Sequence, residues 1–332
     1  MKKVFSLFVF VALLVSCKEE ENPGAAVYAK AIELSTDRLF VQKGTYEILK
    51  VKFSPSNVTE RDMTWVSLNP AVFSVDDGIV IGLSIGSAEL IAKCGDATAR
   101  CKVTVTLNPT VNGYEFVEMG DGLKWATCNM EGEAPHSYGE YFAWGETEVK
   151  SEYNWESYEW VQKDQADENH ISKYSRKDDV KTGIWYDGDN FKGDKGDGKE
   201  YLDYASYGFV DDPAHVNWGF PWRTPTVGEW EVLMDTEKFT WTWTANYDDT
   251  GIKGVIVTSK IKGYEGNRIF IPAAGFRTQK DIVGQNSECT YWSSSLSTVS
   301  SAKGWSLYTT GSLPSGADNY RYIGTPVRPV SE

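Results

Sequence analysis

The sequence predicts a multidomain exported protein in which an all-β sandwich precedes a larger domain of short strands and loops. Three observations lead to this prediction. Residues 1–17 have the pattern of an export signal. Residues 28–107 alternate polar and apolar side chains in short runs, and residues 112–330 combine frequent Trp and Tyr with scattered Gly. The 332 residues are enough for two or three domains.

The first element, residues 1–16, is predicted to be a signal peptide. Lys2 and Lys3 supply a positive start, and the apolar run that follows is shorter than the ~20 residues of a membrane-spanning helix. The run ends in Leu-Val-Ser-Cys at residues 14–17, which resembles a bacterial lipobox. In a lipobox the cysteine, here Cys17, becomes the first mature residue and carries lipid. We therefore expect a lipoprotein that is anchored to the outer membrane and exposed at the cell surface.

A polar tether follows at residues 17–27. Its start, Lys-Glu-Glu-Glu at residues 18–21, resembles the acidic tag that sends lipoproteins of Bacteroidetes to the outer surface, and a solvated linker is the alternative. Loss of Lys2 and Lys3 takes the formal net charge from −14 to −16. Since the sequence shows no basic stripe, nucleic acid and anionic lipid are poor partners for this protein.

Residues 28–107 are predicted to form the sandwich, because period-2 alternation gives strands with one buried face. The predicted strands are residues 32–34, 39–41, 48–53, 64–66, 72–75, 79–81, 88–92 and 101–105. The same alternation places Cys94 and Cys101 on inward faces of neighbouring strands. If residues 95–100 form the loop between them, the two cysteines can form a disulfide, and two free buried thiols are the alternative.

Particular residues of this segment point to a specific family of sandwich domains. They are Ile32, Leu34, Gly44, Pro55, residues 65–69, residues 75–78, Gly82, residues 86–88 and residues 101–105. In this arrangement the segment resembles a bacterial Ig-like domain of group 2. The resemblance implies a spacer or an adhesive stalk that performs no chemistry, with Trp65 in its core.

The larger domain, residues 112–330, has one clear helix prediction at residues 226–236. Thr226 is placed to cap the helix, Glu229 follows three residues later, and apolar residues then recur at helical spacing. The rest of the domain is predicted to consist of short strands and loops.

Several blocks of this domain carry a second resemblance. They are residues 122–129, 138–146, 217–230, 270–277 and 291–295, and Val-Arg-Pro-Val at residues 327–330. Together they resemble the Fibrobacter-type major paralogous domain common in surface lipoproteins of Bacteroidetes. The Arg-Thr-Pro-Thr segment is also similar to one in the formylglycine-generating, sulfatase-modifying enzymes, which implies an α+β C-type-lectin-like fold.

Candidate catalytic residues are sparse in the sequence. The three histidines show no zinc-ligand spacing, and no Gly-x-Ser-x-Gly elbow occurs. The formylglycine-generating relatives act through cysteines in the C-terminal part of the domain, where this chain has only Cys289, so that activity is not expected. Cys128 lies far upstream and is a candidate for a structural disulfide with Cys289. The 47 Asp and Glu leave room for a glycosidase pair, so a hydrolase is a minor alternative.

Other polar residues are expected to build the fold. Ser293, Ser294 and Ser295 are predicted to lie in a core strand, and Arg223 is predicted to bond a carboxylate or carbonyl groups inside the domain. Four Asp between residues 187 and 197 would suit calcium, but they match no calcium-loop motif and a solvated loop is favoured. We therefore expect no metal and no other cofactor.

The predicted function is recognition without catalysis. The Ig-like stalk presents a lectin-like domain that binds a glycan or a surface protein, with exposed rings stacking on the ligand. A structural or adhesive component of a surface assembly is the alternative. The candidate rings, which lie in or beside the variable loop region, are Trp144, Trp155, Trp160 and Trp185.

Overall fold

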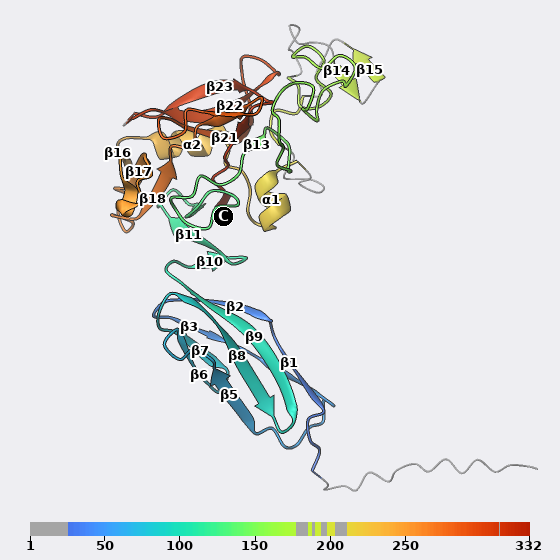
Figure 1. The fold of residues 1–332 in the computed structure, drawn as a ribbon, viewed down its shortest axis with the longest axis vertical. Helices are drawn as coiled ribbons and strands as arrows, with labels where there is room; N and C mark the ends of the chain where they lie inside the picture. The colour runs from blue at the N-terminus through green and yellow to red at the C-terminus, as the bar shows by residue number, and fades with distance from the viewer. Residues whose placement is uncertain (1–25, 177–184, 188–189, 194–197, 203–210, 312) are drawn as a thin grey trace, which may run out of the picture. The chain divides into compact units, whose positions relative to one another are not determined.

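The computed structural model describes residues 26–176, 185–187, 190–193, 198–202, 211–311 and 313–332. Within these residues the fold is mostly β (Figure 1). The chain divides into two compact units, the first made of Met1–Leu39 and Gly44–Thr104, the second of Phe40–Lys43 and Val105–Glu332. No helix in the described part of the chain is long and apolar enough to cross a bilayer.

The first unit contains two main sheets. The larger sheet has the order β2-β9-β8-β5, the smaller has the order β3-β7-β6, and β1 pairs with β4. The strands are β1 (Ala31–Leu34), β2 (Arg38–Gln42), β3 (Tyr46–Ile48), β4 (Val51–Ser54), β5 (Met63–Ser67), β6 (Phe73–Asp76), β7 (Ile79–Gly82), β8 (Gly86–Cys94) and β9 (Ala97–Thr106).

Period-2 alternation builds the core of this unit. Every second residue from Leu90 to Cys94 is buried on β8, and every second residue from Cys101 to Val105 is buried on β9. The predicted inward faces are therefore confirmed. Trp65, predicted as a core residue, is half-buried.

One predicted strand is wrong. Residues 48–53 were expected to run as a single strand, but the chain leaves one sheet at β3 and joins another at β4. Between them Leu49 is only 3% exposed and its N–H donates to the carbonyl of Gly78 over 2.9 Å. The carbonyl of Lys50 then accepts from the N–H of Ser35 over 2.9 Å, so consecutive residues bond to different sheets.

The second unit is built from several small antiparallel sheets. Their orders are β10-β11-β12-β25, β13-β24-β19-β20, β16-β17-β18, β21-β22-β23 and β14-β15. The strands are β10 (Thr110–Val111), β11 (Tyr114–Glu118), β12 (Lys124–Ala126), β13 (Phe142–Ala143), β14 (Trp185–Asp187), β15 (Asn190–Gly193), β16 (Phe239–Thr244), β17 (Gly254–Ser259), β18 (Arg268–Pro272), β19 (Phe276–Thr278), β20 (Asp281–Val283), β21 (Cys289–Leu296), β22 (Lys303–Thr309), β23 (Ser315–Tyr320), β24 (Gly324–Thr325) and β25 (Val330–Ser331).

Among the described residues two α-helices accompany these sheets, α1 (Pro213–Trp218) and α2 (Val227–Met234), with a 3-10 turn at Tyr247–Asp249. The predicted capping box at α2 is confirmed: the Thr226 side chain accepts from the Glu229 N–H, and the Glu229 carboxylate accepts from the Thr226 N–H. Helix α2 contacts β21 and β22, and Figure 1 shows it beside the β21-β22-β23 sheet.

Tryptophan rings fill much of the core of the second unit. In each of the fully buried rings the indole N–H donates to an acceptor inside the unit. These rings are Trp125, Trp144, Trp222, Trp230 and Trp292. Because a buried donor without a partner costs about 1–3 kcal/mol, these bonds allow large polar-edged rings to replace aliphatic side chains in a core of short strands.

Candidate functional site

Trp144 belongs to the core and offers no ring to a ligand. It is 1% exposed, its indole nitrogen donates to the Ser293 carbonyl over 2.8 Å, and the guanidinium of Arg321 lies 4.8 Å from its ring centroid. Gly304 packs so closely on this ring that a Cβ there would approach it to 2.6 Å. The prediction of a ligand-stacking role for Trp144 is therefore wrong, because the fold buries both the ring and its polar edge.

Neither Trp160 nor Trp185 gives support to its predicted role as a ligand-stacking ring. The Trp160 indole nitrogen donates to the Gly145 carbonyl over 2.6 Å, and the Lys173 ammonium lies 4.3 Å from the ring centroid, so this half-buried ring already has an intramolecular partner. Trp185 opens β14, but its side chain lies outside the described part of the structure.

Trp155 lies in a cluster of half-exposed rings, which we call the aromatic cluster. The centroid of the Trp155 ring is 5.0 Å from that of Tyr322 and 5.9 Å from that of Tyr320, at interplanar angles of 65° and 73°. The Tyr320 and Tyr322 rings are nearly parallel, at 13° and 5.7 Å. Tyr320 is 38% exposed, whereas Tyr158 below the cluster is fully buried and contacts Trp155 edge-on at 5.8 Å.

Charged groups flank the aromatic cluster. The Lys303 ammonium lies 5.1 Å from the Tyr320 ring centroid, and a hydrogen bond to Glu168 together with the charge of that carboxylate raises the pKa of Tyr320. Between the two tyrosines Arg321 points inward and is fully buried. Its guanidinium donates to Tyr158 Oη over 2.8 Å and to backbone carbonyls, which fixes the strand end that carries both exposed rings.

The four cysteines of the described residues are free thiols. The pairing predicted for Cys94 and Cys101 fails because β9 begins at Ala97, so the hairpin turns at Gly95 and Asp96. The Ser87 and Thr104 hydroxyls, 2.9 Å apart, mark the register of the hairpin. In that antiparallel register Cys101 lies opposite Leu90, several residues from Cys94.

The candidate pair Cys128 and Cys289 is not bonded either. Burial raises the pKa of both thiols, and Cys289 is fully buried, with its thiol 3.5 Å from the Ile271 carbonyl oxygen. Raised thiol pKa values oppose the thiolate that nucleophilic cysteines require.

Arg223 bonds a carboxylate inside the unit and Ser293, Ser294 and Ser295 lie in a core strand, as the sequence predicted. The Arg223 guanidinium donates to both carboxylate oxygens of Glu229, over 2.8 and 2.6 Å. All residues of β21 are buried; Ser293 Oγ donates to the Trp305 carbonyl over 2.9 Å, and Ser295 Oγ accepts from the Val227 N–H over 2.9 Å.

Sequence reasoning missed a second fully buried guanidinium, that of Arg328. It is 0% exposed, and its guanidinium donates to Asn129 Oδ1 and to the carbonyls of Ala126 and Phe270 over 2.8–3.0 Å. Burial lowers the pKa of Arg328. The signal was its position in an apolar Val-Arg-Pro-Val run, which suits a buried segment.

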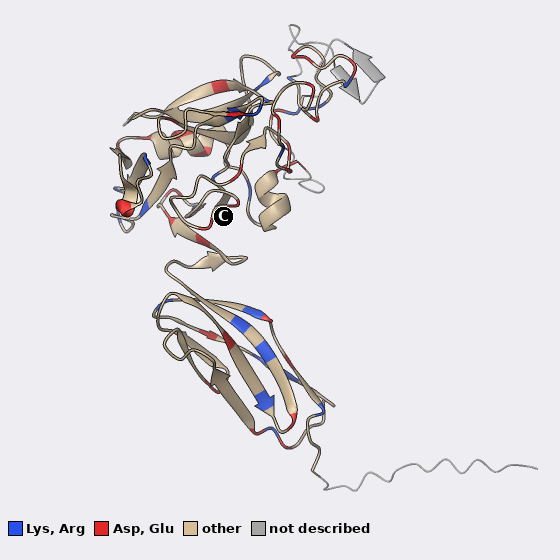
Figure 2. Ribbon diagram, in the orientation of Figure 1, with Lys and Arg blue, Asp and Glu red and all other residues tan. Residues whose placement is uncertain are grey.

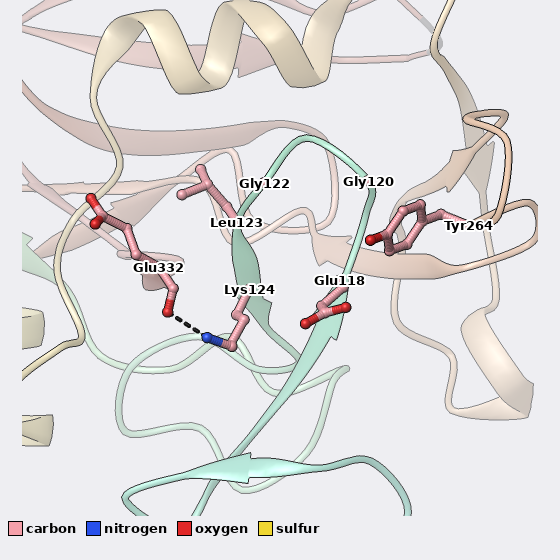
Figure 3. A pocket seen from close by; sticks show the side chains of 7 residues that line it. All are labelled: Glu118, Gly120, Gly122, Leu123, Lys124, Tyr264 and Glu332. Atoms are coloured by element: carbon pink, nitrogen blue, oxygen red, sulfur yellow. Dashed lines mark hydrogen bonds between the residues drawn. The ribbon is translucent and has the colours of Figure 1, made fainter.

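A pocket of about 180 Å³ opens beside β12 (Figure 3). On one side Lys124 donates to the backbone oxygen of Glu332, and on the other lie Tyr264 and Glu118. Its lining residues are Glu118, Gly120, Gly122, Leu123, Lys124, Tyr264 and Glu332. Because its one ammonium is already bonded within the chain, the pocket is a weaker candidate for recognition than the aromatic cluster.

The remaining predictions concern a metal site and the N-terminal segment. Within the described residues no three His, Cys, Asp or Glu side chains gather as a metal site would require. The predicted signal peptide, the lipidation site Cys17 and residues 18–21 lie outside the described residues, as do Asp189, Asp194 and Asp197 of the possible calcium loop.

Residues 28–110 match the family model of the bacterial Ig-like domain, group 2, which confirms the predicted resemblance for that segment. No curated protein matches the chain. Among solved structures, the chain is similar to domains 4 and 5 of the S-layer protein SbsC, with 18% identity and a TM-score of 0.21 over 24% of this chain and 52% of that one. A structure of SbsC domains 5–6 gives 20% identity and a TM-score of 0.23 over 28% and 51%. The chain thus covers about half the length of each.

Proposed function

We propose that this protein is a lipid-anchored cell-surface recognition protein, in which the Ig-like unit is a spacer and residues 112–330 form a non-catalytic, C-type-lectin-like binding domain. The observation that carries the proposal is the aromatic cluster, where Tyr320, Tyr322 and Trp155 are held together at a solvent-exposed edge. The proposed ligand is a glycan or a surface protein, and the proposed location is the outer membrane, through lipid on Cys17.

The chemistry of the cluster supports binding. Aromatic rings supply contact area at little cost in conformational entropy, and their faces accept the C–H edges of sugar rings or apolar protein side chains. Glu168 can accept hydrogen bonds from hydroxyl groups and Lys303 can donate them. Since buried Arg321 fixes the backbone between the two tyrosines, the rings are preorganised, which reduces the ordering cost of binding.

The thiols support a non-catalytic domain. Cysteine-based catalysis requires an accessible thiolate, whereas burial raises the pKa of Cys289 and of Cys128 in this unit. A second candidate function, a structural or adhesive component of a surface assembly, is supported by the match of residues 28–110 to the bacterial Ig-like family.

Glycan-array binding of the native protein and of Tyr320→Ala and Trp155→Ala variants tests the proposal. We expect each variant to lose at least about fivefold in affinity, because a stacking ring contributes on the order of 1–3 kcal/mol. Phe220→Ala is the matched control, since Phe220 is an exposed ring of the same unit (74%) outside the cluster. Equal affinities of the native protein and both cluster variants for every bound glycan or protein would refute the site.

A further inference from the structure

The net charge of this protein is confined to one part of the chain. Residues 1–104 contain 12 Lys and Arg against 12 Asp and Glu, so their formal charge is zero. Residues 105–332 contain 21 Lys and Arg against 35 Asp and Glu, so they carry the whole charge of −14. Without Lys2 and Lys3 of the predicted signal peptide the first region carries −2, so a nearly neutral region precedes a strongly acidic one.

The neutral region nevertheless has a basic face. The outward side of the β2-β9-β8-β5 sheet carries four exposed cations, while Glu89 is the one acidic residue within these four strands. Figure 2 shows the basic residues in blue along this sheet. The cations, which we call the basic face, are Arg38, Lys93, Arg100 and Lys102.

Strand geometry gathers these cations. Arg100 and Lys102 are two residues apart on β9, so they share a face at a spacing of about 7 Å. The Lys102 N–H donates to the Asp37 carbonyl over 2.8 Å, which places Lys102 beside the start of β2 and Arg38. In the hairpin register Lys93 lies diagonally across from Arg100.

The basic face keeps most of its charge available. Arg100 pairs with Glu89 over 2.6 Å, but both side chains stay about half exposed, and an exposed pair of this kind is worth little. Within the described structure Arg38, Lys93 and Lys102 make no side-chain ion pair. The face thus presents a net charge of about three.

Much of the acidic charge of residues 105–332 is concentrated in one short stretch of sequence. Residues 131–168 contain 11 Asp and Glu but only two lysines. One lysine, Lys150, is neutralised by Glu146 over 2.7 Å. Seven of the acids are exposed, Glu131, Glu133, Glu140, Glu148, Glu156, Glu159 and Asp164. We call this stretch the acidic segment.

We propose that the basic face of one molecule docks onto the acidic segment of a second copy of the same chain. Opposite charges attract across this contact, whereas two basic faces or two acidic segments would repel each other. The contact is therefore head to tail, and each molecule keeps one free face and one free segment. Such a heterologous contact extends from copy to copy unless it closes into a ring.

Sedimentation velocity of the native protein over a range of concentrations tests this self-association. We expect association at about 0.02 M salt and at least about tenfold weaker association at about 0.3 M, where the Debye length falls below the spacing of the charges. Lys93→Glu combined with Lys102→Glu should abolish association. Lys30→Glu combined with Lys50→Glu is the matched control, because it makes the same change in net charge at exposed lysines outside the basic face.

A mixing experiment separates specific docking from loss of folding. A Glu148→Lys and Glu156→Lys variant should not self-associate, and neither should the basic-face variant, but an equimolar mixture of the two should associate. Circular dichroism checks that both are folded. A native protein that stays monomeric at low salt, a control pair that weakens association equally, or a mixture that fails to associate would each overturn the proposal.

Discussion

The two units solve the problem of building a core in opposite ways. The first unit uses long alternating strands, β8 and β9, whose inward side chains are small or aliphatic. The second has mostly shorter strands and fills its core with Trp rings and the fully buried guanidinium groups of Arg321 and Arg328. Twelve of the 13 Trp lie in residues 105–332. Where strands are short, large side chains whose polar edges are hydrogen-bonded fill the core and fix the positions of the surrounding backbone.

The largest loss of stability is expected when a buried cation is removed from the second unit. Arg328→Met should cost about 3–5 kcal/mol, because it leaves the Asn129 side chain and two carbonyl groups buried without their donor. Native-state hydrogen exchange should show the loss in the second unit and leave β8 and β9 unchanged. Arg268→Met, at an exposed position of β18, is the control and should have little effect.

A complementary change targets the sandwich. Leu90→Ala should cost about 3 kcal/mol, since Leu90 is fully buried between the sheets and its removal leaves a cavity. Ile48→Ala, at a side chain that is 55% exposed, should cost far less. Calorimetry of both variants measures the difference. Equal costs would show that the alternating pattern does not define the core of this unit.

An acid titration probes the cap of α2. Burial raises the pKa of Glu229, but hydrogen bonds from Arg223 and Thr226 outweigh it and the net pKa is lowered. The unfolded chain, with a Glu pKa of about 4.3, then binds more protons than the native state in acid. Stability from this group is therefore fully present above that pH and is lost as pH falls through the native pKa. Glu229→Gln should remove about 1 kcal/mol at neutral pH and flatten this dependence in urea titrations.

The smallest effect concerns the four thiols of the described residues, two in each unit. Alkylation in denaturant without reductant should modify Cys94, Cys101, Cys128 and Cys289, because all four are free. Intact mass measures the number of added groups. Modification of only two of the four would show that one disulfide forms in the protein.

Local patterns predicted the fold best. The capping box of α2 and the inward faces of β8 and β9 depend on residues near each other in sequence, and the structure contains both. The predicted resemblance to a bacterial Ig-like domain depended on turn residues of the same local kind, and the family match at residues 28–110 confirms it.

Features that depend on distant residues escaped prediction. Trp144 and Trp155 were both candidate ligand rings, yet Trp144 is buried against Ser293 and Arg321, which lie about 150 residues or more away in sequence. The basic face was missed for the same reason, since Arg38 is far from Lys93 in sequence and adjacent strands bring them onto one surface. The aromatic cluster likewise joins Trp155 to Tyr320 across more than a hundred residues.

Trp65 is the single indole of the sandwich, because every other Trp lies beyond residue 104. Its ring packs near Gly78, whose φ of 77° and closeness to the Leu49 carbonyl leave no space for a side chain. Replacing Trp65 with Phe would make the sandwich silent at excitation wavelengths selective for indole, so that all remaining emission would report on the other unit. The difference between the two emission curves would then follow the unfolding of the sandwich alone, without cutting the chain.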